Sequence, residues 1–295
     1  MQVVLDKGQQ YGWFDCTWIC WLSLFSLACM FFFIVWELEI KSPIVNLRVF
    51  ENLNFVIGTI LGTLVNILVC VTIILLPQFF QGLMHYTASS TGLALGSRVV
   101  ACIALFFIGK LCQLYDVRAL IAIGFSLLGV SIIMCADLNM QVAPTTIILS
   151  NVLFGIGAVF TLVPISALAL GTLGKDQIAN AAGIHSLTKC VAGSVFTSLA
   201  SSFSISFAQV HQTYLLKNMS IYNQVFVNHF SALKNAFSQS NVAFVASHKA
   251  NAMLYHQLLA QTKLCALADL FQIAALVSFI VIPSVVLFKL QSTNK

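Results

Sequence analysis

Charged residues are the scarcest component of this sequence. Of 295 residues, 59% are hydrophobic and only 8% are charged, about a third of the charged fraction of a typical soluble domain. A soluble chain of this length needs far more charged side chains to cover its cores. The net charge of +5 comes without a basic run or basic residues interleaved with aromatics, which argues against a nucleic-acid partner. The lipid bilayer is therefore the predicted partner of this chain.

Motifs for hydrolysis, nucleotide binding and metal binding are also missing. The sequence contains no GxSxG, HExxH or P-loop pattern, so it predicts a protein that is not an enzyme and has no cofactor. The nine cysteines form no CxxC pair and lie mostly in apolar stretches, as small core-filling residues do. No metal site is predicted. The first sixteen residues lack the basic region and the small-residue cleavage site of a signal peptide.

Long apolar stretches dominate what is present. Each is close to the ~20 residues that a helix needs to cross a ~30 Å hydrocarbon core. Short connectors with polar residues, Gly and Pro favour helices over the strands of an outer-membrane barrel. The predicted fold class is all-α membrane with seven transmembrane helices. These helices cover residues 17–36, 55–80, 91–111, 119–136, 146–173, 178–203 and 265–288.

Basic residues of the short connectors fall on one side of the predicted membrane, and cytoplasmic loops carry such an excess. Among the short connectors of the opposite side, only Lys7 is basic. The long connector at residues 204–264, which holds four more lysines, is left out of this comparison because long loops cross the membrane largely regardless of charge. We therefore predict a multi-pass protein of the inner (cytoplasmic) membrane, with the N-terminus outside and the C-terminus in the cytoplasm. The basic residues assigned to the cytoplasmic side are Lys41, Arg48, Lys110, Arg118, Lys175, Lys289 and Lys295.

The connector at residues 204–264 is too long for a simple loop, and the charge bias makes it extracytoplasmic. Its second part, residues 243–264, has apolar residues at helical spacing between polar ones, which predicts an amphipathic surface helix. Two interpretations stay open. The helix caps the bundle by packing on it, or it forms a docking surface for a periplasmic adaptor.

Charged residues inside apolar stretches are the candidate site residues, because a charge in a membrane span costs at least ~2.5 kcal/mol. Lys189 lies eleven residues into its stretch, about 16 Å along the helix axis. Two interpretations of this lysine stay open. It pairs with a carboxylate or with helix carbonyls, or it belongs to a substrate or proton pathway. Arg98 is shallower, which favours snorkelling or structural pairing over transport.

Asp269 begins the last predicted helix, four residues past Cys265. A carboxylate suits a helix N-terminus electrostatically, so capping is the first interpretation and proton exchange the second. Asn66 and Gln78 add uncharged polarity to the second stretch. They line a cavity or bind a neighbouring helix.

Small residues and a proline mark the helix at residues 146–173. Gly155 and Gly157 allow a close helix approach, and Pro164 removes a backbone donor and predicts a kink. Gly193 is grouped with them as a packing or gating residue. His185, near the predicted cytoplasmic start of the next helix, is interpreted as structural.

Three segments carry a family resemblance. LDKGQQYGWF (5–14) is similar to an extracellular "LDxGxxxDWF" segment, with Gly12 where Asp is usual. IVWELEIKSPIVNLRVFENLNF (34–55) matches a cytoplasmic linker, and IILLPQFFQGLMHYTASSTGLAL continues the match into the next helix. In these motifs the chain resembles the fourteen-helix drug:proton antiporters typified by EmrB and QacA, within the major facilitator superfamily.

Two further motifs extend the resemblance. GKLCQLYDVRALI looks like a degenerate copy of the superfamily's cytoplasmic loop and keeps Gly109, Lys110, Asp116 and Arg118, while Gln113 replaces the first acid. AAGIHSLTKCVAGSVFTS resembles a helix in which Arg is usual where this chain has Lys189.

The resemblance implies the C-terminal half of such an antiporter, because the match begins in the middle of the family pattern. It implies export of amphipathic or cationic small molecules against proton flow, by alternating access between two helix bundles. The implied partner is a missing or separately encoded N-terminal half. The expected regions are an extracytoplasmic segment 1–16, an extra central helix 17–36, a cytoplasmic linker 37–54, a six-helix bundle 55–288 and a cytoplasmic tail 289–295.

Two alternatives to this half-transporter stay open. One is a non-transporting protein, either a truncated remnant or an assembly partner for a separate N-terminal half. The other is a seven-helix receptor, which the linker motif and the Lys189 helix motif disfavour.

Overall fold

A computed structural model describes residues 3–4, 16–39, 47–139, 142–217, 219, 222, 224–238 and 243–287. All regular secondary structure in this part of the chain is helical, which confirms the all-α prediction. The motif at 5–14, part of the linker and the tail at 289–295 lie outside it. Six of the described helices are long and apolar enough to cross a membrane, and residues 17–32 form a shorter apolar helix. The protein is a multi-pass membrane protein.

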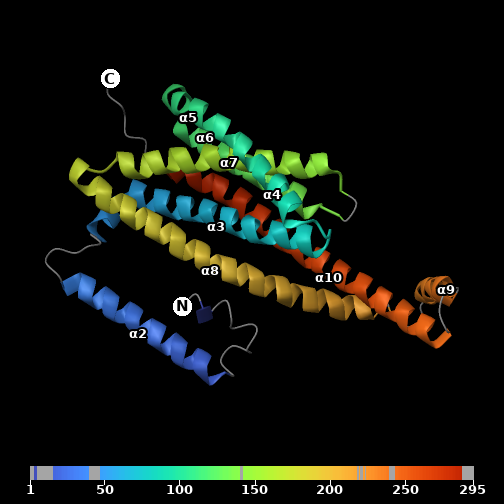
Figure 1. Ribbon diagram of the computed structural model, residues 1–295. Helices are drawn as coiled ribbons and strands as arrows, with labels where there is room; N and C mark the ends of the chain where they lie inside the picture. Colours follow the sequence, from blue (N-terminus) through green and yellow to red (C-terminus); the bar gives the residue numbers. More distant parts are fainter. Residues whose placement is uncertain are drawn as a thin grey trace.

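The first long helix, α2 (Thr17–Glu39), stands apart from the other helices (Figure 1). Its aromatic side chains are exposed, including Trp21 at 68% and Phe25 at 70%. Such a surface suits lipid or another protein and not water. The short 3-10 helix η3 (Leu47–Glu51) follows it and leads into the bundle.

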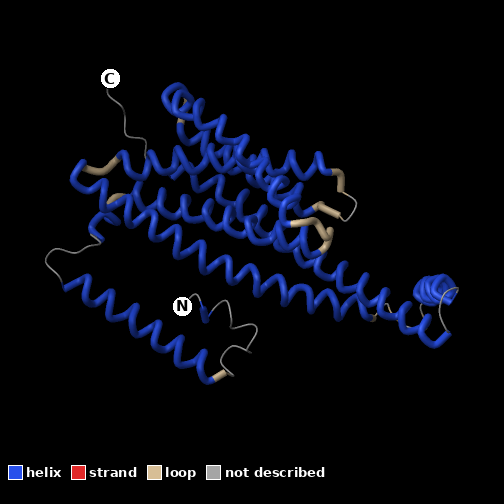
Figure 2. The backbone as a smooth tube through the Cα atoms, viewed as in Figure 1, coloured by secondary structure: helices blue, strands red, loops and turns tan. Residues whose placement is uncertain are grey.

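Short loops join most of the remaining helices, as the tan segments of Figure 2 show. The predicted helix at 91–111 is built from two α-helices that flank a 3-10 turn. The bundle and its extension consist of α3 (Leu53–Gly82), α4 (Ala88–Gly96), η4 (Ser97–Ala101), α5 (Cys102–Leu114), α6 (Val117–Ala136), α7 (Pro144–Gly171), α8 (Lys175–Leu216), α9 (Gln224–Ser238), α10 (Ala243–Val281) and η5 (Ile282–Leu287).

The core lies between α3, α6, α7 and α10. Phe79, Phe125 and Phe271 from three of these helices are almost fully buried there. Within the bundle α7 packs on α6 and α3, α3 packs on α8, and α10 packs on α6 and α8. The six spans can be counted as two sets of three. The first set is α3, the span made of α4, η4 and α5, and α6; the second set is α7, α8 and α10. The α3–α8 contact joins the first helix of the first set to the middle helix of the second, and the contact of α7 with η4 and α5 joins the first helix of the second set to the middle span of the first.

The expected loop at residues 204–264 is largely helical. Helix α8 continues to Leu216 and α10 starts at Ala243, so both run past the end of α3 toward α9 (Figure 1). The 39 residues of α10 give about 58 Å of helix, against a hydrocarbon core of ~30 Å. Asp269 therefore lies deep inside α10, and its interpretation as a helix N-cap is wrong. The physical reason is that residues 243–264 form helix continuously with the apolar span.

Candidate functional site

Polar side chains meet in the middle of the bundle where α3 packs on α8. The amide nitrogen of Asn66 on α3 donates a 2.8 Å hydrogen bond to the backbone carbonyl of Lys189 on α8. One turn further along α8, a Cβ at Gly193 would lie 2.8 Å from that amide nitrogen and 3.0 Å from the sulfur of Cys70. A larger residue at position 193 would have to displace the Asn66 or Cys70 side chain, which is consistent with the packing role predicted for Gly193.

Lys189 itself is half-buried on α8. The only ion pair among the described residues involves other side chains, so the expected carboxylate partner of Lys189 is not found in this part of the chain. A membrane-embedded ammonium needs a polar surrounding or a water-filled cavity. Lys189 lies on α8 at the contact with α3, opposite the middle of α3.

His185, which the sequence interpretation took as structural, also lies at this contact. It lies four residues before Lys189, and residues at this spacing share one helix face. Its side chain is only 3% exposed, and Nδ1 lies 3.3 Å from the Thr59 hydroxyl on α3. Its Nε2 is buried without a hydrogen-bond partner. We call Thr59, Asn66, His185 and Lys189 the α3–α8 polar seam.

Arg98 lies in η4, where the second span changes from α-helix to 3-10 helix. Its Nε donates a 2.8 Å hydrogen bond to the Asn151 side chain on α7, and its guanidinium carbon lies 4.4 Å from the Phe154 ring centroid. A Cβ at Gly155 would lie 2.8 Å from the Arg98 carbonyl oxygen. The geometry fits the structural pairing that the sequence favoured, and Asn151 is the partner that the sequence did not reveal.

Gly157 and Pro164 lie further along α7. A Cβ at Gly157 would come within 2.9 Å of the Leu128 backbone nitrogen and 3.0 Å of the Gly124 carbonyl oxygen on α6. The α6–α7 contact is therefore backbone against backbone at this glycine. Pro164 is buried and lies inside α7.

Asp269 on α10 forms the one ion pair of the described residues. Its Oδ2 lies 2.7 Å from Nε2 of His211 on α8, with both side chains partly exposed. The interaction joins the two long helices α8 and α10. His211 was missed because the sequence assigned residues 204–264 to a loop.

The loop motif predicted to be cytoplasmic forms no ion pair among the described residues. Gly109 and Lys110 lie in α5, and Asp116 occupies the N-cap position of α6 without a side-chain cap bond. Arg118 Nε is buried without a partner, and no described acid pairs with it. Gln113 stands where the resembled loop motif has its first acid, and an uncharged amide cannot form an ion pair with a basic residue.

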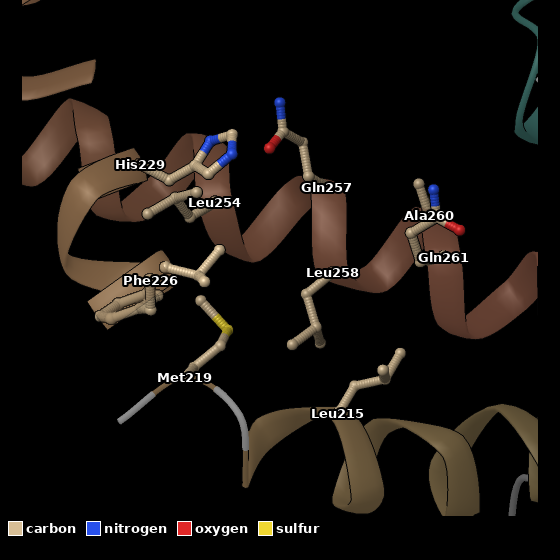
Figure 3. A pocket seen from close by; sticks show the side chains of 10 residues that line it. Leu215, Met219, Phe226, His229, Leu254, Gln257, Leu258, Ala260 and Gln261 are labelled. Carbon is tan, nitrogen blue, oxygen red and sulfur yellow. The ribbon is translucent and has the colours of Figure 1, made fainter. Parts of the chain in front are cut away.

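Two cavities lie toward the end of the bundle from which α8 and α10 extend. The first has a volume of about 370 Å³, and Gln78 lines it with Gly82, Gln209 and Lys263. The second, of about 540 Å³, lies between the end of α8, α9 and α10 (Figure 3). Asn66 and Gln78 were both expected to line a cavity or bind a neighbouring helix, and each residue does one of the two. Asn66 binds α8, and Gln78 lines a cavity.

These features define a multi-pass helical membrane protein whose polar groups are gathered between closely packed spans. No protein-family model matches the chain. Known proteins do match it. The multidrug export protein EmrB of Haemophilus influenzae is 24% identical over 278 residues, covering 94% of this chain and 53% of that protein.

Other relatives are of the same kind. The EmrB protein of Escherichia coli strain K12 is 28% identical over 231 residues, and the fatty acid resistance protein FarB of Neisseria gonorrhoeae is 27% identical over 226 residues. Each match covers 76% of this chain and 44% of the relative. The chain spans about half the length of the curated relatives it matches. Its homologues are multidrug exporters of the EmrB type, which confirms the family resemblance of the motifs.

Proposed function

We propose that this chain provides the C-terminal six-helix bundle of a multidrug efflux transporter, which works as a drug:proton antiporter by alternating access. The observation that carries this proposal is the similarity to EmrB over 94% of the chain. The α3–α8 polar seam supports it, because substrate sites of such transporters lie near the bilayer midplane at the interface of two repeats.

The proposed substrates are amphipathic or cationic organic compounds. The relatives are named for multidrug export, fatty acid resistance and lincomycin resistance. The compounds in these names are chemically diverse. Lys189 and Asn66 are the proposed residues of the substrate or proton pathway in this bundle. Asp269, paired with His211, is the proposed proton-exchanging carboxylate.

The proposed setting is the inner membrane, with the N-terminus outside, the C-terminus in the cytoplasm and the helical extension at 204–264 outside. If the transporter works with a periplasmic adaptor, we propose that the adaptor docks on this extension. A second bundle supplies the other wall of the transport path, because one bundle can line only one side of it.

Dye efflux in cells that lack their own pumps tests the proposal. The chain as given is compared with the same chain joined to, or co-expressed with, an N-terminal bundle from an EmrB-type protein. Efflux that needs both bundles and stops when the proton gradient is collapsed supports antiport. No efflux from the combined bundles, with both present in the membrane, favours the alternative of a non-transporting protein. Efflux by the chain alone contradicts the need for a second bundle.

A further inference from the structure

We propose that the cavity between the end of α8, α9 and α10 binds an amphipathic small molecule with an uncharged or anionic polar end, which it takes from water. This site goes beyond the proposed transport path. Its volume of about 540 Å³ falls within the ~300–1,000 Å³ of small-molecule sites. We call it the extension pocket.

The extension pocket lies beyond the membrane-spanning part of the bundle. Helix α3 ends at Gly82, and the cavity that Gly82 lines also includes Lys263 and Leu267 of α10. This places the end of the α3 span level with Lys263. The α10 residues of the extension pocket, 254–261, precede Lys263 by two to nine residues, or about 3 to 14 Å along the axis. The pocket therefore lies beyond the end of α3, and we infer that water reaches it.

The lining of the extension pocket is nevertheless apolar. The buried side chains of Leu254 and Leu258 on α10 line it together with Leu215 of α8. Val225 and Phe226 of α9 add to this apolar lining. Val225 is 67% exposed. Apolar concave surface held in water by three separate helices marks a binding site, because covering it removes that surface from water. The occupant needs an apolar body.

The polar groups of the extension pocket define the other end of the ligand. Figure 3 shows the His229 ring and the Gln257 amide on the side of the pocket away from Leu215, with Gln261 further along α10. An imidazole and two amides donate and accept hydrogen bonds. No carboxylate is among the described residues that line the pocket, so none of them compensates a cationic head group. An uncharged or anionic end fits best, and a quaternary ammonium fits least.

Photo-crosslinking of the full chain in phosphatidylcholine nanodiscs tests this proposal without requiring transport. The probe is dodecanoate with a diazirine near the end of its chain, and peptide mass mapping locates the adducts. We expect adducts on residues 215–219 and 254–261, suppressed by excess dodecanoate. Leu258→Gln should weaken saturable labelling by about tenfold or more, the effect of ~1.4 kcal/mol of lost binding.

Met253→Gln is the matched control, because Met253 is 41% exposed on the same helix and does not line the pocket. Phe226→Gln, on α9, is the second variant should Leu258→Gln unfold the α8–α10 contact. Circular dichroism and the unfolding midpoint establish that each variant is folded.

Three results would overturn the assignment. The first is labelling spread over the membrane spans without saturation. The second is pocket labelling obtained only from a diazirine phospholipid in the disc and not displaced by dodecanoate, which would make the occupant a membrane lipid. The third is equal labelling by a dodecyltrimethylammonium probe, which would contradict the predicted head group. Because efflux is not measured, failure here leaves the proposed transport function untouched.

Discussion

The Asn66 side chain donates a hydrogen bond to the backbone carbonyl of Lys189, 123 residues further along the chain. This bond ties the middle of α3 to α8, one turn before Gly193, where a Cβ would meet the Asn66 amide nitrogen. In a bilayer such interhelical bonds are worth about 0.6 kcal/mol on average and up to about 1.7 kcal/mol.

Asn66→Leu is therefore expected to lower the free energy of unfolding by about 1 kcal/mol. The change keeps an apolar side chain of similar size and removes the donor. Unfolding by SDS from mixed micelles, followed by circular dichroism, measures the effect. Gln81→Leu is the control, because Gln81 is exposed at the end of the same helix. Equal effects of the two substitutions would contradict a specific role for the bond.

Gly157→Ala should destabilise the bundle by about 1–3 kcal/mol, the usual cost of overpacking. The new methyl group meets the α6 backbone at Leu128 and Gly124, and backbone cannot move aside as a flexible side chain can. Gly183→Ala is the matched control, since nothing lies within 4 Å of a Cβ there. It should be neutral, or stabilising by up to about 1 kcal/mol through helix propensity. The order of the two SDS unfolding midpoints checks this prediction.

Arg98→Lys should remove most of the coupling between η4 and α7. An ammonium can keep the cationic contact with the Phe154 ring but cannot reproduce the planar guanidinium that also reaches Asn151. A double-mutant cycle with Asn151→Leu is expected to give a coupling energy of about 1 kcal/mol. A coupling energy near zero would mean that the two side chains do not support each other.

A reporter fused after Ser238, at the end of α9, tests the charge-based orientation. Alkaline phosphatase, which folds actively only outside the cytoplasm, should be active at this site, and green fluorescent protein should be dark when exported unfolded. The expectation rests on the excess of Lys and Arg in the opposite connectors. A fluorescent and phosphatase-inactive pair of fusions would reverse the orientation.

The spans were largely predictable because length and hydropathy decide which helices enter a bilayer. The predicted helix at 119–136 is found as Val117–Ala136, and the one at 146–173 as Pro144–Gly171. The extent of α8 and α10 was not predictable in this way. Hydropathy marks where the bilayer ends, whereas the backbone hydrogen bonds of a helix continue for as long as the residues beyond it favour helix. Asp269 was misread as a cap for this reason.

The contacts of the candidate site residues were not predictable from the sequence. Lys189, Arg98 and Asn66 stand out as polar groups in apolar stretches, and the structure gives Arg98 and Asn66 specific partners. Those partners depend on the register between helices, which a single sequence does not contain. The Arg98–Asn151 and His211–Asp269 pairs join residues 53 and 58 positions apart. The histidine of the second pair lies in a segment whose polarity resembles that of a loop.

The unbroken length of α10 has a mechanical consequence. A continuous helix acts as a stiff lever, so a change of its tilt inside the bilayer displaces the part outside in proportion to distance. If α10 keeps the constant rise per residue of a regular helix, a rotation of about 10° around its apolar end moves a point ~40 Å along its axis by about 7 Å. Helix α9, which packs on the first part of α10, would travel with it. Rearrangement among the spans is thereby transmitted to the water-exposed tip without a hinge.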